Sequence, residues 1–200
     1  ANTTADNLSQ IAYGEETVEI TAAELSGITG FDAEVTSGLT IQVGSGTAVD
    51  LGELAAASSK TERLGQVVEA INRKTSETGV SAFLVDNGDG SYDVELLSSR
   101  LDANGDPEDI TFGSGFTASA TGIAVADGGN IAAASAADST GIANLDITTE
   151  KGAYIAMKKV DAALDAVNSA RATLGAVQSR FENAVANIQI TGENISAARG

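Results

Sequence analysis

Large apolar side chains in the last fifty residues recur at alternating steps of three and four positions. Polar or small residues (Arg171, Gln178 and Gly192) occupy the other positions of the same stripe. This heptad spacing is typical of a coiled coil with polar interruptions, and it predicts a helix with one apolar face. We call the apolar members of the stripe the seam: Val160, Leu164, Val167, Leu174, Phe181, Val185, Ile188 and Ile195.

The ends of this helix are indicated by capping residues and by the absence of proline. Thr148 or Thr149 can cap the first turn, Glu150 suits the positive end of the helix dipole, and no proline occurs before Gly200. The sequence therefore predicts one continuous helix over residues 150–198. A helix of about fifty residues is about 75 Å long.

The seam is too apolar to remain in water. Burying eight large side chains is worth, as an upper bound, on the order of 10–20 kcal/mol. The other predicted helix, residues 61–74, is only about 20 Å long and can cover a third of the seam at best. We expect the remaining cover to come from another part of the polypeptide or from other subunits, although periodicity alone is equally consistent with an ordinary helical bundle.

Residues 1–149 follow a different pattern, in which short alternating segments lie between glycine-rich turns. From Tyr92 to Leu96, apolar and acidic residues alternate, which indicates a strand with one buried face. One helix is predicted from Thr61 to about Lys74, with Gly79 placed to end the segment. The predicted strands are residues 17–21, 40–43, 81–85, 92–97 and 109–112.

These elements predict an α+β fold in three parts. Residues 1–112 form an acidic β-rich domain with one short helix. Residues 113–145, rich in Gly, Ala and Ser, form a return segment and linker with one strand at Ile123–Ala126. Residues 146–200 form the long coiled-coil-like helix.

Two loops combine acidic residues with glycine. In the first, residues 86–91, a calcium site would use Asp86, Asp89, Asp93 and Glu95. A hairpin turn is favoured instead, because Asn-Gly and Asp-Gly supply the positive φ angles of tight turns and the spacing departs from that of an EF-hand. The second loop, residues 101–109, has the same ambiguity and is interpreted as solvated.

Charge divides the chain at the same place as the periodicity. From Glu150 onward there are six basic and five acidic residues, about +1, whereas residues 1–149 hold five basic and 23 acidic residues, about −18. Such an acidic surface repels nucleic acid and anionic membranes, so neither is expected as a partner. The last fifty residues are neutral enough to pack closely.

The missing residue types exclude most catalytic chemistry. The chain has no His and no Cys, so imidazole acid–base catalysis, thiolate nucleophiles and His- or Cys-based zinc sites cannot be built from it. We predict that the protein is not an enzyme and uses no cofactor or metal. No apolar run approaches the roughly 18–20 residues that a membrane span requires.

Two stretches resemble a known family. Residues 163–199, with the specific run Leu174-Gly-Ala-Val-Gln-Ser-Arg-Phe181, and the lead-in at residues 145–153 closely resemble the carboxy-terminal rod helix of bacterial flagellins. Residues 40–98 are similar to a strand–strand–helix–strand–strand repeat in the outer domains of flagellins and hook-associated proteins. The resemblance implies that residues 1–112 are an outer domain and that the long helix is a rod helix.

The resemblance also implies a function. It predicts an extracellular structural subunit of the flagellar filament, exported through the flagellar channel, whose seam packs against other flagellin subunits in a homopolymer that serves motility. The amino-terminal helices of the family are absent, so the chain is expected to be a piece of the longer protein. The alternatives are a hook–filament junction protein, or a surface adhesin acting through the outer domain.

A host partner is implied by the same resemblance. The rod region of many flagellins is bound by the flagellin-sensing Toll-like receptor of animals, and Gln178 and Arg180 lie in the matching segment. They are the expected receptor contacts within this chain, whereas the main contacts of the family lie on the amino-terminal helix.

Overall fold

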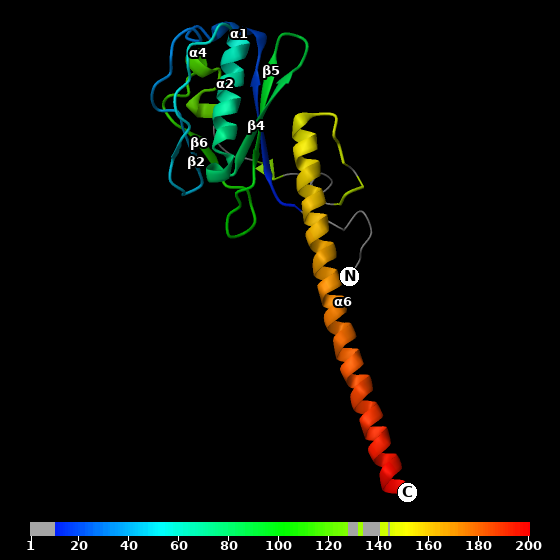
Figure 1. The fold of residues 1–200 in the computed structure, drawn as a ribbon. Helices are drawn as coiled ribbons and strands as arrows, with labels where there is room; N and C mark the ends of the chain where they lie inside the picture. The colour runs from blue at the N-terminus through cyan, green and yellow to red at the C-terminus, as the bar shows by residue number, and fades with distance from the viewer. Residues whose placement is uncertain (1–10, 128–131, 134–140, 144) are drawn as a thin grey trace.

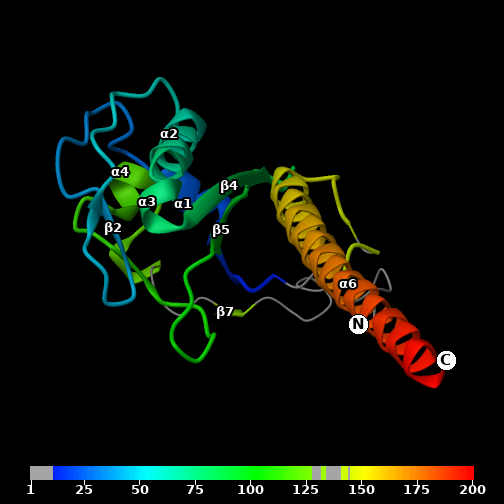
Figure 2. The ribbon, with the colours of Figure 1, turned by 60° about the horizontal axis from the view of Figure 1, so that its bottom comes forward.

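The computed structural model describes residues 11–127, 132–133, 141–143 and 145–200. It has two parts of different shape. Residues 14–127, together with the two-residue strand at 132–133, fold into one domain, for which we keep the name outer domain as a label. One helix of 50 residues, α6 (Glu150–Arg199), starts beside this domain and extends far beyond it (Figure 1). The turned view in Figure 2 shows the same projection, with the far half of α6 standing clear of every other element.

The larger sheet of the outer domain is antiparallel. It contains β1 (Gly14–Ile20), β4 (Val80–Asp86), β5 (Tyr92–Ser98) and the short β7 (Ala132–Ala133), in the order β4-β5-β1-β7. Val18 of β1 lies opposite Val94 of β5, and both side chains are buried. The alternation predicted for residues 92–97 therefore places its apolar face on the core.

A smaller sheet closes the core from another side. It contains β2 (Thr40–Val43), β3 (Val49–Asp50) and β6 (Ile110–Phe112), in the order β3-β2-β6. Ile41 pairs with Phe112, and the two are almost completely buried. Phe112 also contacts Phe116, with ring centroids 4.6 Å apart.

Helices lie between the strands along the chain. They are α1 (Ala22–Gly27), α2 (Lys60–Arg73), α3 (Thr75–Thr78), α4 (Ala118–Thr121) and the 3-10 turn η1 (Val125–Asp127). Ser59 caps α2 by accepting a hydrogen bond from the Glu62 backbone N–H, and α2 buries Leu64 and Ile71. Gly79 ends α3 with a φ of 75°, a left-handed conformation that favours glycine.

Side chains from α2 and α3 cover the first residues of β4 along its outer edge. The Asn72 amide donates to the Ala82 carbonyl and accepts from the Ala82 N–H, at 2.8 and 2.7 Å. The hydroxyl of Thr75 donates to the Val80 carbonyl, and the hydroxyl of Thr78 accepts from the Val80 N–H. At Val80 and Ala82, these side chains supply the bonds that another strand would supply.

A buried arginine joins α2 to the loop before β2. Arg63 has no exposed surface, and its Nη2 donates to the carbonyls of Phe31 and Ala33. Burial lowers the pKa of this guanidinium from its ordinary value, because desolvation disfavours the charged form. The two carbonyls thereby hold the loop against α2.

The strand predictions are confirmed within a few residues, and the single predicted helix of the outer domain corresponds to α2. Two expectations differ from the structure. The strand predicted at Ile123–Ala126 is wrong, because this segment ends in the turn η1 with Ile123 fully buried. The outer domain also contains α1, α3 and α4, which are too short to produce a helical periodicity in sequence.

Part of the expected linker belongs to the core. Phe116 and Ile123 lie within residues 113–145, yet 1% and 0% of their surfaces are exposed. Gly113 and Gly115 let this segment approach β2, since an added Cβ at either position would lie within 2.6 Å of the Gly38 or Ser37 backbone. Much of residues 128–144 lies outside the described residues.

Candidate assembly surface and its junction with the outer domain

The long helix starts and continues as its sequence predicts. Thr149 caps α6 by accepting a hydrogen bond from the Gly152 N–H at 3.0 Å, and the helix runs without a break past Gly175 to Arg199. Gly152 also allows the lead-in to fold back over the first turn. An added Cβ there would lie 2.6 Å from the backbone oxygen of Asp146.

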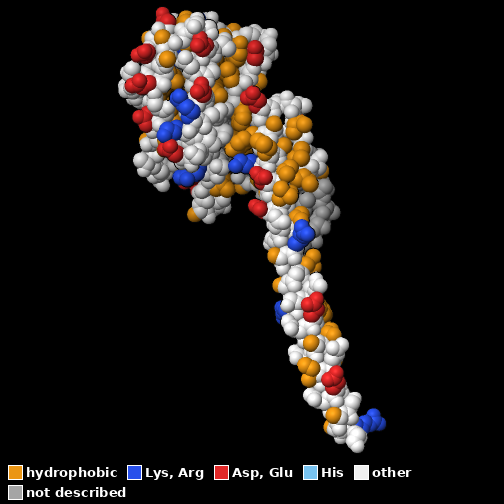
Figure 3. Space-filling view, in the orientation of Figure 1, with side chains coloured by type: hydrophobic (Ala, Val, Ile, Leu, Met, Phe, Trp, Pro, Cys, Tyr) orange, Lys and Arg blue, Asp and Glu red, His pale blue; other side chains and the backbone are white. Residues whose placement is uncertain are grey.

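All eight seam residues are exposed, and they share one stripe of α6. Their exposed fractions run from 38% for Val167 to 70% for Ile188, and Phe181 is exposed to 68%. Beyond Ala163 no residue of α6 is buried. In Figure 3, apolar side chains are visible along the projecting helix, with few charges between them.

A shallow hollow of about 340 Å³ lies on α6 around Phe181. Val177, Arg180 and Ala184 form the rest of its lining. The exposed apolar residues Met157, Val177 and Ile190 add to the seam. Val177 and Ile190 were not predicted, because they fall outside the strict heptad.

The two expected receptor contacts are exposed on the same part of the helix. The Gln178 side-chain amide donates to the Glu182 carboxylate at 3.1 Å, one turn further along. Arg180 lies at the rim of the hollow beside Phe181. Their role in receptor binding stays a prediction.

Two side-chain contacts attach the first turns of α6 to the outer domain, and a third side chain of α6 supports one of them. Lys151 Nζ lies 2.7 Å from the Glu95 carboxylate of β5, in an ion pair that is about four-fifths buried on both sides. The Tyr154 ring lies 5.8 Å from the ring of Phe83 on β4. Lys158 Nζ lies 5.5 Å from the centre of the Tyr154 ring, within the range of a cation–π contact.

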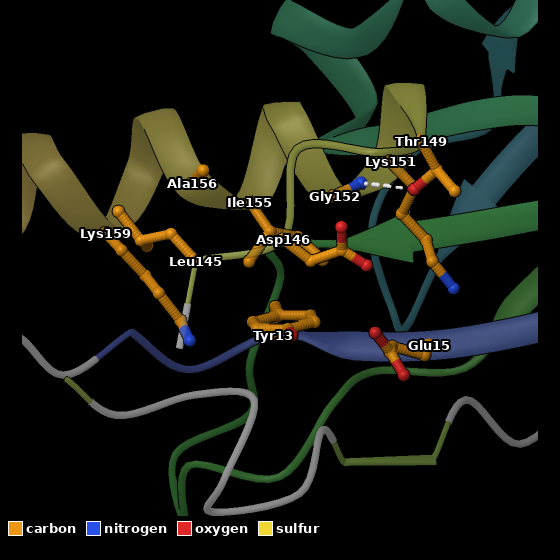
Figure 4. A pocket seen from close by; sticks show the side chains of 10 residues that line it. All are labelled: Tyr13, Glu15, Leu145, Asp146, Thr149, Lys151, Gly152, Ile155, Ala156 and Lys159. Atoms are coloured by element: carbon orange, nitrogen blue, oxygen red, sulfur yellow. Dashed lines mark hydrogen bonds between the residues drawn. The ribbon is translucent and has the colours of Figure 1, made fainter. Parts of the chain in front are cut away.

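A pocket of about 220 Å³ lies between β1, the lead-in and α6 (Figure 4). Tyr13 and Glu15 line it from the β1 side, and Asp146 lines it from the lead-in. The Asp146 carboxylate accepts hydrogen bonds from the backbone N–H and the hydroxyl of Thr148, which lower the pKa of its carboxyl group. Lys159 is also part of the lining and is 2% exposed.

The acidic loop at residues 86–91 is a hairpin turn, as predicted. The Asn87 N–H donates to the Ser91 carbonyl, and Gly88 and Gly90 adopt positive φ angles of 77° and 89°. Asp89 accepts from the N–H and hydroxyl of Ser91, and these bonds lower the pKa of its carboxyl group. Among the described residues, no group of three or more carboxylates is arranged to hold a metal ion.

The loop at residues 101–109 is organised by one aspartate. The Asp102 carboxylate accepts from the backbone N–H groups of Asn104 and Asp106, at 2.8 and 2.9 Å. These hydrogen bonds lower the pKa of the Asp102 carboxyl group. As in the hairpin turn, the carboxylate is used to hold its own loop.

Both the outer domain and α6 match known protein families. The bacterial flagellin C-terminal helical region matches residues 157–200, which include the whole seam, and the flagellin hook IN motif matches residues 38–95 of the outer domain. The chain belongs to the bacterial flagellin family. The two matches, in this order along the chain, agree with the two resemblances found in the sequence.

Individual flagellins are similar over most of this chain. A B-type flagellin of Pseudomonas aeruginosa is 32% identical over 88% of this chain and 42% of its own length. Flagellin C of Vibrio cholerae is 33% identical over 70% of this chain and 36% of its own length. This flagellin chain therefore spans less than half the length of these relatives.

One solved structure gives a weaker match. The D2-D3 domains of the flagellar cap protein FliD from Escherichia coli align with 54% of this chain and 55% of that chain, at 20% identity and a TM-score of 0.30. Within the described ranges, no helix has both the length and the apolar character needed to cross a bilayer.

Proposed function

We propose that this flagellin is a structural subunit of the bacterial flagellar filament. In this proposal the seam of α6 packs against rod segments of the longer polypeptide and of neighbouring copies. The observation that carries the proposal is the exposure of all eight seam residues along one helix. A continuous apolar stripe of this kind is typical of an interaction site.

The charge distribution supports the same role. The α6 segment is close to neutral, so copies of it can approach closely, whereas the acidic outer region favours contact with water. We accordingly place the protein outside the cell, in the filament. The outer domain would then face solvent while the rod segments pack inside.

We also infer that the role is structural rather than catalytic. The chain has no His and no Cys, and the pocket between β1, the lead-in and α6 is lined by Tyr, carboxylates, lysines, aliphatic residues and small residues. A nucleophile with an adjacent imidazole base is therefore impossible within this chain.

A contact with the flagellin-sensing Toll-like receptor of animals is a further part of the proposal. Gln178 and Arg180 are exposed and lie one turn or less from Phe181, on a helix that presents both polar and apolar side chains. If the two residues contact the receptor, replacing both with Ala in the complete protein should weaken receptor activation. Unchanged activation would remove them from the proposed contact.

The assembly proposal is tested in the complete protein with two matched substitutions. Phe181→Asp places a charge on the seam, and Asn183→Asp places the same charge two residues away on another face of α6. We expect the Phe181 variant to lose filament formation in sedimentation and electron microscopy, while the Asn183 variant assembles. Normal filaments from the Phe181 variant would contradict a role for the seam.

A further inference from the structure

The outer domain holds α6 by a short stretch at its beginning. Burial along the helix ends at Ala163, although α6 continues to Arg199. Figures 1 and 2 show the first turns of α6 near β4 and the far half of the helix clear of every other element. The angle between the outer domain and α6 therefore depends on a few side chains and on the segments of chain that connect the domain to the helix.

Two of these contacts bind neighbouring strands to one face of the helix. Lys151 pairs with Glu95 on β5, and Tyr154, three residues later, contacts Phe83 on β4. Positions three residues apart lie on the same side of an α-helix. Two points of attachment on separate strands restrict rotation of the helix about either contact, which a single contact would permit.

The attached face differs from the face that carries the seam. Lys151 and Tyr154 point toward the sheet, whereas Val160 and Leu164 are exposed to 41% and 56%. At 3.6 residues per turn, Val160 lies about half a turn around the helix from Lys151. Partners can therefore cover the seam without displacing either contact.

We propose that the Glu95–Lys151 ion pair and the Phe83–Tyr154 ring contact form a clamp that sets the tilt of the outer domain on the rod helix, independently of any partner on the seam. Lys158, one turn further along α6, lies over the Tyr154 ring and so supports the Phe83–Tyr154 contact. The tilt is then a property of the single chain. This inference goes beyond filament assembly and does not depend on it.

The clamp can be tested by spin-label distances in the chain itself. The protein has no cysteine, so Asp32→Cys on an exposed loop of the outer domain and Asp165→Cys on α6 give one unique label pair. Electron–electron double resonance should show one narrow distance distribution in this background. The double change Glu95→Gln and Tyr154→Ala should abolish it and leave a broad distribution.

Three further measurements separate a clamp from general damage. Glu95→Lys should broaden the distance distribution. Adding Lys151→Glu should make it narrow again, because the ion pair is then restored with its charges reversed. Phe181→Ala, on the seam, should leave it unchanged. Amide hydrogen exchange in β4 and β5 shows whether the outer domain remains folded in each variant.

The outcomes decide the proposal. A narrow distribution that survives the double change, in a folded outer domain, would show that the connecting segments alone set the tilt and would overturn it. A broad distribution in the unaltered background would overturn it as well. Loss of the narrow distribution only in the clamp variants, with rescue by the charge reversal, supports it.

Discussion

The outer domain and the projecting part of α6 use apolar residues in opposite ways. In the outer domain, side chains from two sheets and α2 cover one another, and residues such as Ile41, Leu64 and Ile71 have no exposed surface. Beyond Ala163, α6 has equally large apolar residues that this chain leaves exposed. The difference shows that an apolar pattern specifies an element and its buried face, while the covering partner must be identified separately.

The largest expected effect comes from comparing one phenylalanine in each region. Phe112→Ala should destabilise the outer domain by about 3–5 kcal/mol, because it leaves a cavity next to Phe116 and Ile41. Phe181→Ala should have almost no effect on the melting of this chain, because its ring is 68% exposed. Thermal and urea unfolding of both variants checks the comparison.

The same Phe181→Ala change should behave differently in the complete protein. If the seam is covered there, the substitution should lower the free energy of unfolding by about 3–5 kcal/mol, as for a buried ring. Equal melting of the variant and the parent in the complete protein would show that the seam remains exposed, and the contrast between the two regions would no longer hold.

The second prediction concerns Arg63, the polar residue in the covered region. Arg63→Ala should cost about 1–3 kcal/mol, because the carbonyls of Phe31 and Ala33 lose their buried donor. Lys60→Ala serves as the control, since Lys60 donates to the Ser26 carbonyl at an exposed position. Urea unfolding should separate the two variants, and equal midpoints would argue against a structural role for the buried guanidinium.

The third prediction compares two glycines of α6. Gly175→Ala should stabilise the helix by about 0.5–1 kcal/mol, because a Cβ there meets nothing within 4 Å and glycine is a poor helix former. Gly152→Ala should instead disturb the first turn, because its Cβ would lie against the Asp146 carbonyl. Circular dichroism during heating should show higher helix stability only for the Gly175 variant.

The smallest effect is expected at the exposed turn of Asp89. Hydrogen bonds from Ser91 lower the pKa of this carboxyl group below its ordinary value of 3.8. Because the pKa is depressed in the folded state, the stabilisation is complete above the unfolded pKa and is lost as the pH falls through the folded pKa. In an acid titration followed by nuclear magnetic resonance, the Ser91 amide should report this loss.

Asp89→Asn should remove that transition from the Ser91 amide. The loop of Asp102, whose pKa is lowered by the backbone N–H groups of Asp106 and Asn104, provides the internal control. The Asn104 amide should titrate alike in both proteins. A Ser91 amide that titrates unchanged in the variant would show that another carboxylate governs this turn.

Local periodicity accounts for what could be predicted from the sequence. Alternation predicted the main strands, and heptad spacing placed the seam on one continuous helix. The turns α1 and α4 and the buried Ile123 were not predictable in this way, because segments of four to six residues contain no full helical period. The clamp was missed for a related reason, since Glu95 and Lys151 are 56 residues apart and only the tertiary fold joins them.

The covered residues at the β4 edge affect whether the sheets of neighbouring outer domains can pair at high local concentration. An open strand edge can template pairing with any extended chain, and such pairing leads to fibrous aggregates. Asn72, Thr75 and Thr78 already satisfy the outward backbone groups of Ala82 and Val80. Neighbouring outer domains therefore meet backbone groups that are already bonded at Val80 and Ala82, so this stretch of the edge does not template pairing between their sheets.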